Sequence, residues 1–307
     1  MWDGKRNLVA AIAAVAFVLF GAGCRKSTTA PALDTSVSSS QDAAQSIANA
    51  MGEDNGGVTD QMGDIADATG SAGISSNVGA EAPEGALMKT VATAGDSVVK
   101  TFNTADTSWT IFVSRVRVGL FGRQAGFTRT YYVKFINKDG VALPRYITLT
   151  SPVDTAYSII FMVENGTGHI ITRFVSTHLL SLSSNFLVAG TNTTTLTFNG
   201  SFTRTGTDTI TTLTGQRVLN YTLTATLQNV TRPRVPRYTL GSTIVRATGG
   251  TITGTYTAAV SVLKGDSYSE RNFTKTFTVT FGDNTGTIDV DGSKFNCDLQ
   301  SGEAASN

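Results

Sequence analysis

The sequence has few of the residues on which catalytic and metal sites usually depend. Its 307 residues include two histidines, His169 and His178, and two cysteines, Cys24 and Cys297. A zinc site needs three or four converging ligands, and neither histidine has a second one at the ligand spacing of a helix or a strand. Serine and threonine are abundant, but nothing like a nucleophile elbow surrounds any of them. We therefore expect a protein that is not an enzyme, with no catalytic residue, no metal ligand and no cofactor.

A calcium loop is not expected either. The stretch Asp289–Gly292 contains two acidic residues, Asp289 and Asp291. It lacks the longer series of ligands ending in Glu that an EF-hand loop requires. An Asp-Gly pair is a common β-hairpin turn, and a turn is the role that we expect here.

The chain as a whole has no large excess of either positive or negative charge, and its formal net charge is +1. The two parts of the chain differ in the sign of their charge. Residues 24–99 hold 3 Lys/Arg and 10 Asp/Glu, whereas residues 100–307 hold 19 Lys/Arg and 12 Asp/Glu. No basic patch with regularly spaced aromatics is present, so we expect no nucleic-acid partner. The densest basic cluster contains Arg232, Arg234 and Arg237. It could touch anionic headgroups, but a solvated connector is the stronger expectation, since loops run over the surface.

Long apolar runs are confined to the N-terminus, where Leu8–Phe20 follows the basic Lys5 and Arg6. This run is shorter than the roughly 20 residues of a membrane-spanning helix, and the small residues at 21–23 close it. Basic start, apolar run and small residues follow one another in the order of a secretory signal. Residues 1–23 are therefore expected to be a signal peptide.

Cys24 follows the signal directly, and this arrangement resembles the lipobox of bacterial lipoproteins. The resemblance implies that the mature chain begins at Cys24 and carries acyl chains there that bind the membrane; several such chains anchor a protein durably. Arg25 stands where an Asp often retains such proteins at the inner membrane. The resemblance thus implies an exported, membrane-anchored protein, on the outer membrane if the source has one. The alternative is a plain cleaved signal or a signal anchor in which Cys24 is incidental.

Residues 24–100 are expected to form a lipid-anchored tether with short helices. Residues 25–40 are rich in Ser, Thr, Ala and Pro and are typical of a flexible linker. Apolar residues recur at spacings of three and four in Ser38–Met51 and less regularly in Thr59–Ala68, which predicts two short helices. Both are too short to be stable alone in water, so they either dock on the following domain or fray. Ala86–Lys100 is a third helix or a lead-in strand.

Residues 101–302 have the pattern of an antiparallel β domain. Apolar residues such as Phe277, Val279 and Phe281 alternate with Thr, and short Gly/Asn/Asp turns separate the runs. Crossover helices are absent, which argues against a parallel sheet. One apolar and one Thr-rich face are typical of a sheet with one side on a core and the other in water. We expect an all-β fold, with a large antiparallel sheet that forms a sandwich or a curved, partly closed barrel, followed by a disordered tail at 303–307.

Cys297 lies in the last expected strand and shares its parity with Phe295 and Leu299. If Cys24 is lipidated, Cys297 has no partner within the chain. We expect a reduced, buried thiol with a structural role. The alternative is a disulfide between two chains.

Several segments carry a wider resemblance. They are Asn199-Gly200 after Thr-Leu-Thr-Phe, Tyr221–Val230, Gly250–Tyr256, Gly292–Gly302 and the helical Ser46–Gly57. Together they resemble a group of uncharacterised bacterial lipoproteins, over most of the mature chain. The resemblance implies a Thr-rich antiparallel β domain behind a lipobox-type signal, and it implies no activity.

Two functions remain open at this point. The first is a lipid-anchored, non-enzymatic scaffold or binding module of the cell envelope, with a protein, glycan or lipid ligand. The second is a carrier of a lipophilic ligand, in which the curved sheet surrounds an apolar cavity and the helices near Ile47 and Ile65 form its lid. A packed interior favours the first function, and an empty apolar cavity favours the second.

Overall fold

The structure is a computed structural model that describes residues 35–69, 97–118, 124–148, 154–172, 175–212, 215–235, 246–264, 267–282 and 285–306. The expected signal peptide, Cys24 and most of the expected linker lie outside these residues. Apart from Thr35, the described residues belong to one compact unit, Ser36–Asn307.

Two helices form close to where the sequence predicts them. Helix α1 covers Thr35–Met51 and helix α2 covers Val58–Thr69. At the end of α1, the Gly52 N–H donates to the Ala48 carbonyl over 2.9 Å. The chain then turns towards α2 through Gly56, whose φ of +64° is a conformation that glycine adopts without steric cost.

Fifteen strands follow in the described residues. They are β1 (Ser97–Asn103), β2 (Ser108–Val118), β3 (Gln124–Ile136), β4 (Ala142–Leu143), β5 (Ile147–Thr148), β6 (Asp154–Thr155), β7 (Ser158–Ile171), β8 (Val175–Ala189), β9 (Thr195–Thr212), β10 (Gly215–Pro233), β11 (Gly249–Lys264), β12 (Ser267–Gly282), β13 (Thr285–Val290), β14 (Ser293–Asp298) and β15 (Glu303–Ser306). Thirteen strands form one antiparallel sheet in the order β1-β2-β3-β7-β8-β9-β10-β11-β12-β13-β14-β15, with β4 beside β3. Strands β5 and β6 pair with each other.

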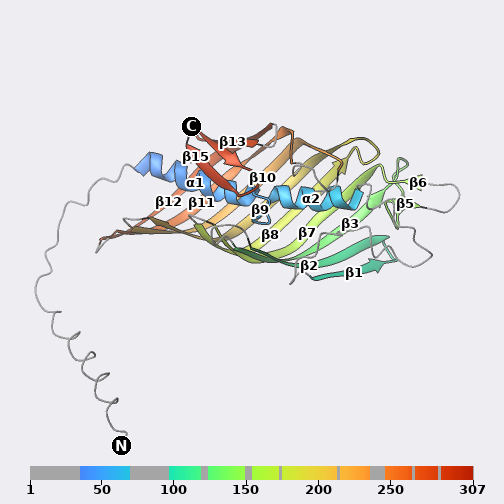
Figure 1. Cartoon of the computed structure of the whole chain (residues 1–307), viewed down its shortest axis with the longest axis horizontal. Helices are drawn as coiled ribbons and strands as arrows, with labels where there is room; N and C mark the ends of the chain where they lie inside the picture. The colour runs from blue at the N-terminus through green and yellow to red at the C-terminus, as the bar shows by residue number, and fades with distance from the viewer. Residues whose placement is uncertain are drawn as a thin grey trace, which may run out of the picture. The chain divides into compact units, whose positions relative to one another are not determined.

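The large sheet is open and curved. Its outermost strands, β1 and β15, each pair on one side only within the described part of the chain. Figure 1 shows α1 and α2 lying end to end across the long strands, which bend around them. The expected all-β antiparallel class is confirmed in its curved form, and the two large packed sheets of a sandwich do not occur among the described residues.

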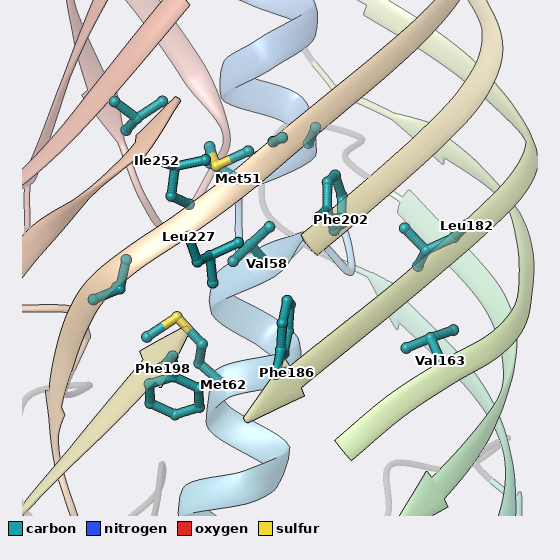
Figure 2. Packing of buried hydrophobic residues seen from close by; sticks show 14 of the residues in the cluster. Met51, Val58, Met62, Val163, Leu182, Phe186, Phe198, Phe202, Leu227 and Ile252 are labelled. Carbon is teal, nitrogen blue, oxygen red and sulfur yellow. The ribbon is translucent and has the colours of Figure 1, made fainter. Parts of the chain in front are cut away.

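One hydrophobic core joins the helices to the sheet. Burial alternates along the long strands β8 and β10, as period-two patterning requires. Figure 2 shows Met51 of α1 and Met62 of α2 among Phe186, Phe198 and Leu227 of the strands. The apolar side chains of both helices in this core are at most 1 % exposed. The helices therefore dock on the concave face of the sheet and fill it, which is one of the two outcomes expected for them.

Of two stretches at the borders of the sheet, the first adopts one of its expected alternatives and the second differs from expectation. Strand β1 starts at Ser97, so the end of the expected Ala86–Lys100 element is a strand, and the part before it lies outside the described residues. The disordered tail expected at 303–307 is wrong for its first four residues, which form β15 and pair with β14. A side chain of α1 holds this strand, because the Ala304 N–H donates to Gln45 Oε1 over 3.2 Å.

Candidate functional site

The concave face of the sheet carries arginines, and the helices that fill it carry matching carboxylates. Asp60 and Asp64 lie one turn apart on α2, and both are fully buried. Arg115 of β2 donates two hydrogen bonds to Asp64, of 2.8 and 3.2 Å, and Arg129 of β3 donates to Asp60 over 2.9 Å. Charge-assisted and two-pronged hydrogen bonds are among the strongest in proteins, so these contacts fix α2 against β2 and β3.

The α2 ion cluster, as we call it, consists of Asp60, Asp64, Arg115, Arg117, Arg129 and Tyr131. The Tyr131 hydroxyl donates to Asp64 over 2.7 Å, and burial raises the pKa of this phenol, which keeps it a proton donor. The guanidinium of Arg129 also donates to the Gly56 carbonyl and lies 4.3 Å from the centroid of the Phe127 ring. The cluster thus also holds the turn between the two helices.

Helix α1 is held by charges further along the sheet. The carboxylate of Asp42, 2 % exposed, lies 3.0 Å from Arg217 of β10 and 3.8 Å from Arg271 of β12. Burial raises the pKa of Asp42 to about 6, although both arginines act in the opposite direction. This carboxyl therefore takes up a proton in mildly acidic solution.

Two inward-facing residues of β9 contact the C-terminal half of α1. Arg204 donates to Asn49 Oδ1 over 2.7 Å. Asp208 accepts hydrogen bonds from the hydroxyls of Ser46 and Thr177, the latter over 2.6 Å. Burial raises the pKa of Asp208, with Arg204 acting against it. Residues 42 to 49 of α1 are thus joined to the sheet by ion pairs and hydrogen bonds.

These contacts explain the charge asymmetry of the sequence. The acidic excess of residues 24–99 includes the helix carboxylates, and the basic excess of residues 100–307 includes the arginines that face them. The charges neutralise one another in the interior, where an isolated charge is very unfavourable. The composition of the chain shows the two excesses but not their pairing, because the pairing depends on which strand residues face inward.

The arginine cluster near residue 232 is not the solvated connector that was expected. Arg232 still belongs to β10 and is 1 % exposed. Arg234 donates to the carbonyl of Thr69 and to the hydroxyl of Tyr146, each over 2.9 Å. Thr69 is the last residue of α2, where helix carbonyls lack intrahelical partners. Arg234 therefore binds the end of α2, Arg232 is buried, and Arg237 lies outside the described residues.

Hydroxyl groups dominate the outer face of the sheet, which is the face opposite the helices. Thr205, Thr222, Thr257 and Thr274 stand opposite one another in one row across β9 to β12. The hydroxyls of Thr257 and Thr274 lie 3.1 Å apart. Strand geometry spaces such groups by about 4.8 Å across the strands and about 6.8 Å along them. The outer face therefore presents a regular array of hydrogen-bonding groups.

A shallow hollow of about 420 Å³ opens on this outer face over β8 to β12. Asn220, Asn272 and Thr222 supply amide and hydroxyl groups to it, and Leu180 supplies an apolar wall. Leu180 is 53 % exposed and lies at a register shift of β8 against β9. A volume of this size lies within the range of small-ligand sites.

Cys297 is where its strand parity places it. It is 3 % exposed, and its parity neighbours Phe295 and Leu299 are buried as well. Burial raises the pKa of the Cys297 thiol to about 12. The expected buried, free thiol is therefore confirmed within this chain.

The two histidines are neighbours in space. His169 of β7 and His178 of β8 are direct cross-strand partners, and both are exposed on the outer face. Along the sequence, neither histidine has a second one at ligand spacing. The hairpin between β7 and β8 supplies one, because it places His169 and His178, which lie on different strands, directly opposite each other.

The acidic stretch near residue 290 forms the turn that was expected. Asp291 and Gly292 both have positive φ, of 48° and 88°, as a two-residue hairpin turn between β13 and β14 requires. The carboxylate of Asp291 accepts the Thr276 N–H over 3.0 Å and lies 3.1 Å from Lys275 Nζ. Asp289 accepts the Gly292 N–H over 2.7 Å. These carboxylates stabilise the hairpin.

Comparison with known proteins adds no relative, since no family model, curated protein or solved structure matches the chain. Within the described residues, no three His, Cys, Asp or Glu side chains are grouped so that they could hold a metal ion. In that same part of the chain, no helix is long and apolar enough to span a bilayer. Cys24, the expected lipidation site, lies outside it. Function must therefore be inferred from the chain's own sequence and geometry.

Proposed function

We propose that this protein is a lipid-anchored envelope protein that acts as a non-enzymatic scaffold or binding module, and that its ligand binds the outer face of the sheet. The anchor in this proposal is the acylated Cys24 that the lipobox resemblance implies. The membrane is then one partner of the protein, and the ligand that binds the outer face of the sheet is the other.

The filled interior is the observation that carries this proposal. A carrier of a lipophilic ligand needs an apolar cavity on the concave face of its sheet. Here α1 and α2 fill that face, and Arg115 and Arg129 hold α2 there through buried ion pairs. To admit a lipid, the chain would have to separate several buried ion pairs, and breaking one such pair costs about 3–5 kcal/mol. The interior therefore favours the scaffold or binding module over the carrier.

Among protein, glycan and lipid ligands, the outer face favours a glycan. Its threonine hydroxyls and the amides of Asn220 and Asn272 both donate and accept hydrogen bonds, as the hydroxyls of a sugar do. Leu180 offers an apolar patch for a ring face beside them. No net charge is required in such a ligand, which fits a face composed mostly of Thr, Ser and Asn.

Cosedimentation with insoluble polysaccharides tests the proposal directly. Peptidoglycan sacculi, chitin and cellulose serve as probes for the full-length protein in detergent. We expect retention on at least one of them, and we expect Asn220→Lys, which places a long charged side chain in the hollow, to reduce retention at least tenfold. Thr101→Lys on β1 is the matched control, because Thr101 is equally exposed but lies at the far edge of the sheet.

The outcomes separate the two functions. Equal loss with both lysine variants would show that the hollow is not the binding place. Failure to bind any polysaccharide, together with saturable binding of a fluorescent fatty acid by the same protein, would favour the carrier instead.

A further inference from the structure

The histidine pair occupies a defined position on the outer face. In the β-ladder, Gly126 of β3 stands opposite His169, His169 stands opposite His178, and His178 stands opposite Thr207 of β9. The two imidazoles are thus flanked by a residue without a side chain and by a hydroxyl. They are also the only histidines in the chain.

The register brings the two imidazoles within reach of one cation. Side chains directly opposite each other on antiparallel strands have Cβ atoms about 4.5–5.5 Å apart. Zinc binds imidazole nitrogen at about 2.0–2.1 Å, so two rings on such neighbouring positions can converge on one ion. His169 Nε2 lies 3.2 Å from Ser176 Oγ, and this exposed hydrogen bond is one that the ring would exchange for a metal bond.

The surroundings leave room for the ion and its water. Gly126, next to His169, has nothing within 4 Å of the position that a Cβ would occupy. Both histidines are exposed, so the approach from solvent is open. A rigid sheet also fixes the two backbones, which reduces the entropy lost when the rings bind together.

We propose that His169 and His178 form an exchangeable two-histidine site for a divalent transition-metal cation on the outer face of the sheet. Imidazole is a ligand that Cu²⁺, Ni²⁺ and Zn²⁺ accept well, and affinity rises towards Cu²⁺ in the usual order of these ions. With two protein ligands, the ion keeps water in its other positions. The site therefore takes up and releases the ion rather than holding it as part of the fold.

Calorimetric titration of untagged, full-length protein in detergent with Cu²⁺ and with Zn²⁺ tests this site. We expect one equivalent to bind, Cu²⁺ more tightly than Zn²⁺. His169→Gln and His178→Gln should each weaken binding at least tenfold, because a chelate loses its effective-concentration gain with one arm. Thr167→Gln, at an exposed position on the same face of β7, is the control and should leave the affinity unchanged.

Imidazole NMR of the wild-type protein gives a second readout that does not depend on variants. The chain has two imidazoles, and both sets of signals should move together and stop moving at one equivalent of Zn²⁺. The proposal is overturned if the double variant His169→Gln/His178→Gln binds as tightly as the wild type, or if only one imidazole responds.

Discussion

Arg115 stands at a position that the strand pattern assigns to the core. It follows Ile111 and Val113 at the same parity of β2, and it is 1 % exposed. Removing a guanidinium from water costs several kcal/mol unless a partner compensates. Asp64 provides that partner from α2. The burial of Arg115 in the sheet is therefore compensated by a carboxylate of α2, the helix that covers it.

The protonation of Asp42 makes the stability of the folded protein depend on pH. Its folded-state pKa of about 6 lies above the ordinary 3.8, so the folded protein binds the proton more tightly than the unfolded chain. The resulting stability is fully present below about pH 4 and is lost as the pH rises through about 6. Asp42→Asn cannot titrate, so we expect the free energy of unfolding of the wild type, relative to this variant, to fall by about 3 kcal/mol between about pH 4 and pH 7.

Urea unfolding of both proteins over this pH range measures the difference. Asp139→Asn, in an exposed turn, keeps Asp42 and is the control, so its free energy of unfolding should follow that of the wild type across this pH range. A wild-type difference from Asp42→Asn that stays constant, or that grows as the pH rises, would contradict the assignment.

The reactivity of the Cys297 thiol shows whether this side chain is buried. A rise in thiol pKa from 9.0 to about 12 lowers the thiolate fraction at neutral pH about a thousandfold, and the thiolate is the reactive form. Native protein should therefore resist a maleimide that labels the urea-unfolded chain within minutes. Fast labelling of the native protein, or a disulfide-linked dimer on a non-reducing gel, would place Cys297 at an exposed edge instead.

At the scale of elements, helix α2 is attached to the sheet mainly through buried charge. Asp64→Asn keeps the volume of the side chain but removes the carboxylate closest to the buried Arg115, which then has only the carboxylate of Asp60, 3.5 Å away, as a negative neighbour among the described contacts. We expect a loss of about 3–5 kcal/mol in the free energy of unfolding. The same change at the exposed Asp139 should stay within about 0.5 kcal/mol. Equal effects at both positions would mean that the α2 ion cluster does not hold the helix.

Strand β12 offers a direct test of side-chain parity. Phe277 is 3 % exposed and faces the core, whereas the next residue, Thr278, lies on the outer face. Phe277→Ala should destabilise the protein by about 3–5 kcal/mol, and Thr278→Ala by less than about 1 kcal/mol. Chemical unfolding measures both, and comparable losses would overturn the register of β12.

Local sequence patterns predict these elements, but they do not predict which residues far apart in the sequence contact each other. The parity of Phe277 and the helical spacing around Ile47 depend on neighbours within a few residues, so the sequence alone indicates them. The partner of Asp64 lies 51 residues away in Arg115, and no local pattern encodes that distance. The pairing of His169 with His178 requires the register of a hairpin, which a histidine count does not supply.

At the scale of the whole molecule, the two ends of the described chain meet. The turn between α1 and α2 donates hydrogen bonds from the backbone of Glu53 to Leu299, over 2.8 Å, and from Asp54 to Gln300, over 2.9 Å. These partners lie far beyond the helices in the sequence. The contacts around the turn between α1 and α2 are therefore complete only when residues 299 and 300 are in place.

Native mass spectrometry of the protein extracted from its own membrane tests the proposed function most directly. A lipid-anchored binding module with a filled interior predicts the mass of the chain from Cys24 onward plus its acyl chains, with no further lipid retained. Cys24→Ser should lose the acyl mass, remain unprocessed or leave the membrane. A wild-type mass without acyl groups would contradict the anchor, and one retained lipid per chain in both proteins would contradict the filled interior and favour a carrier.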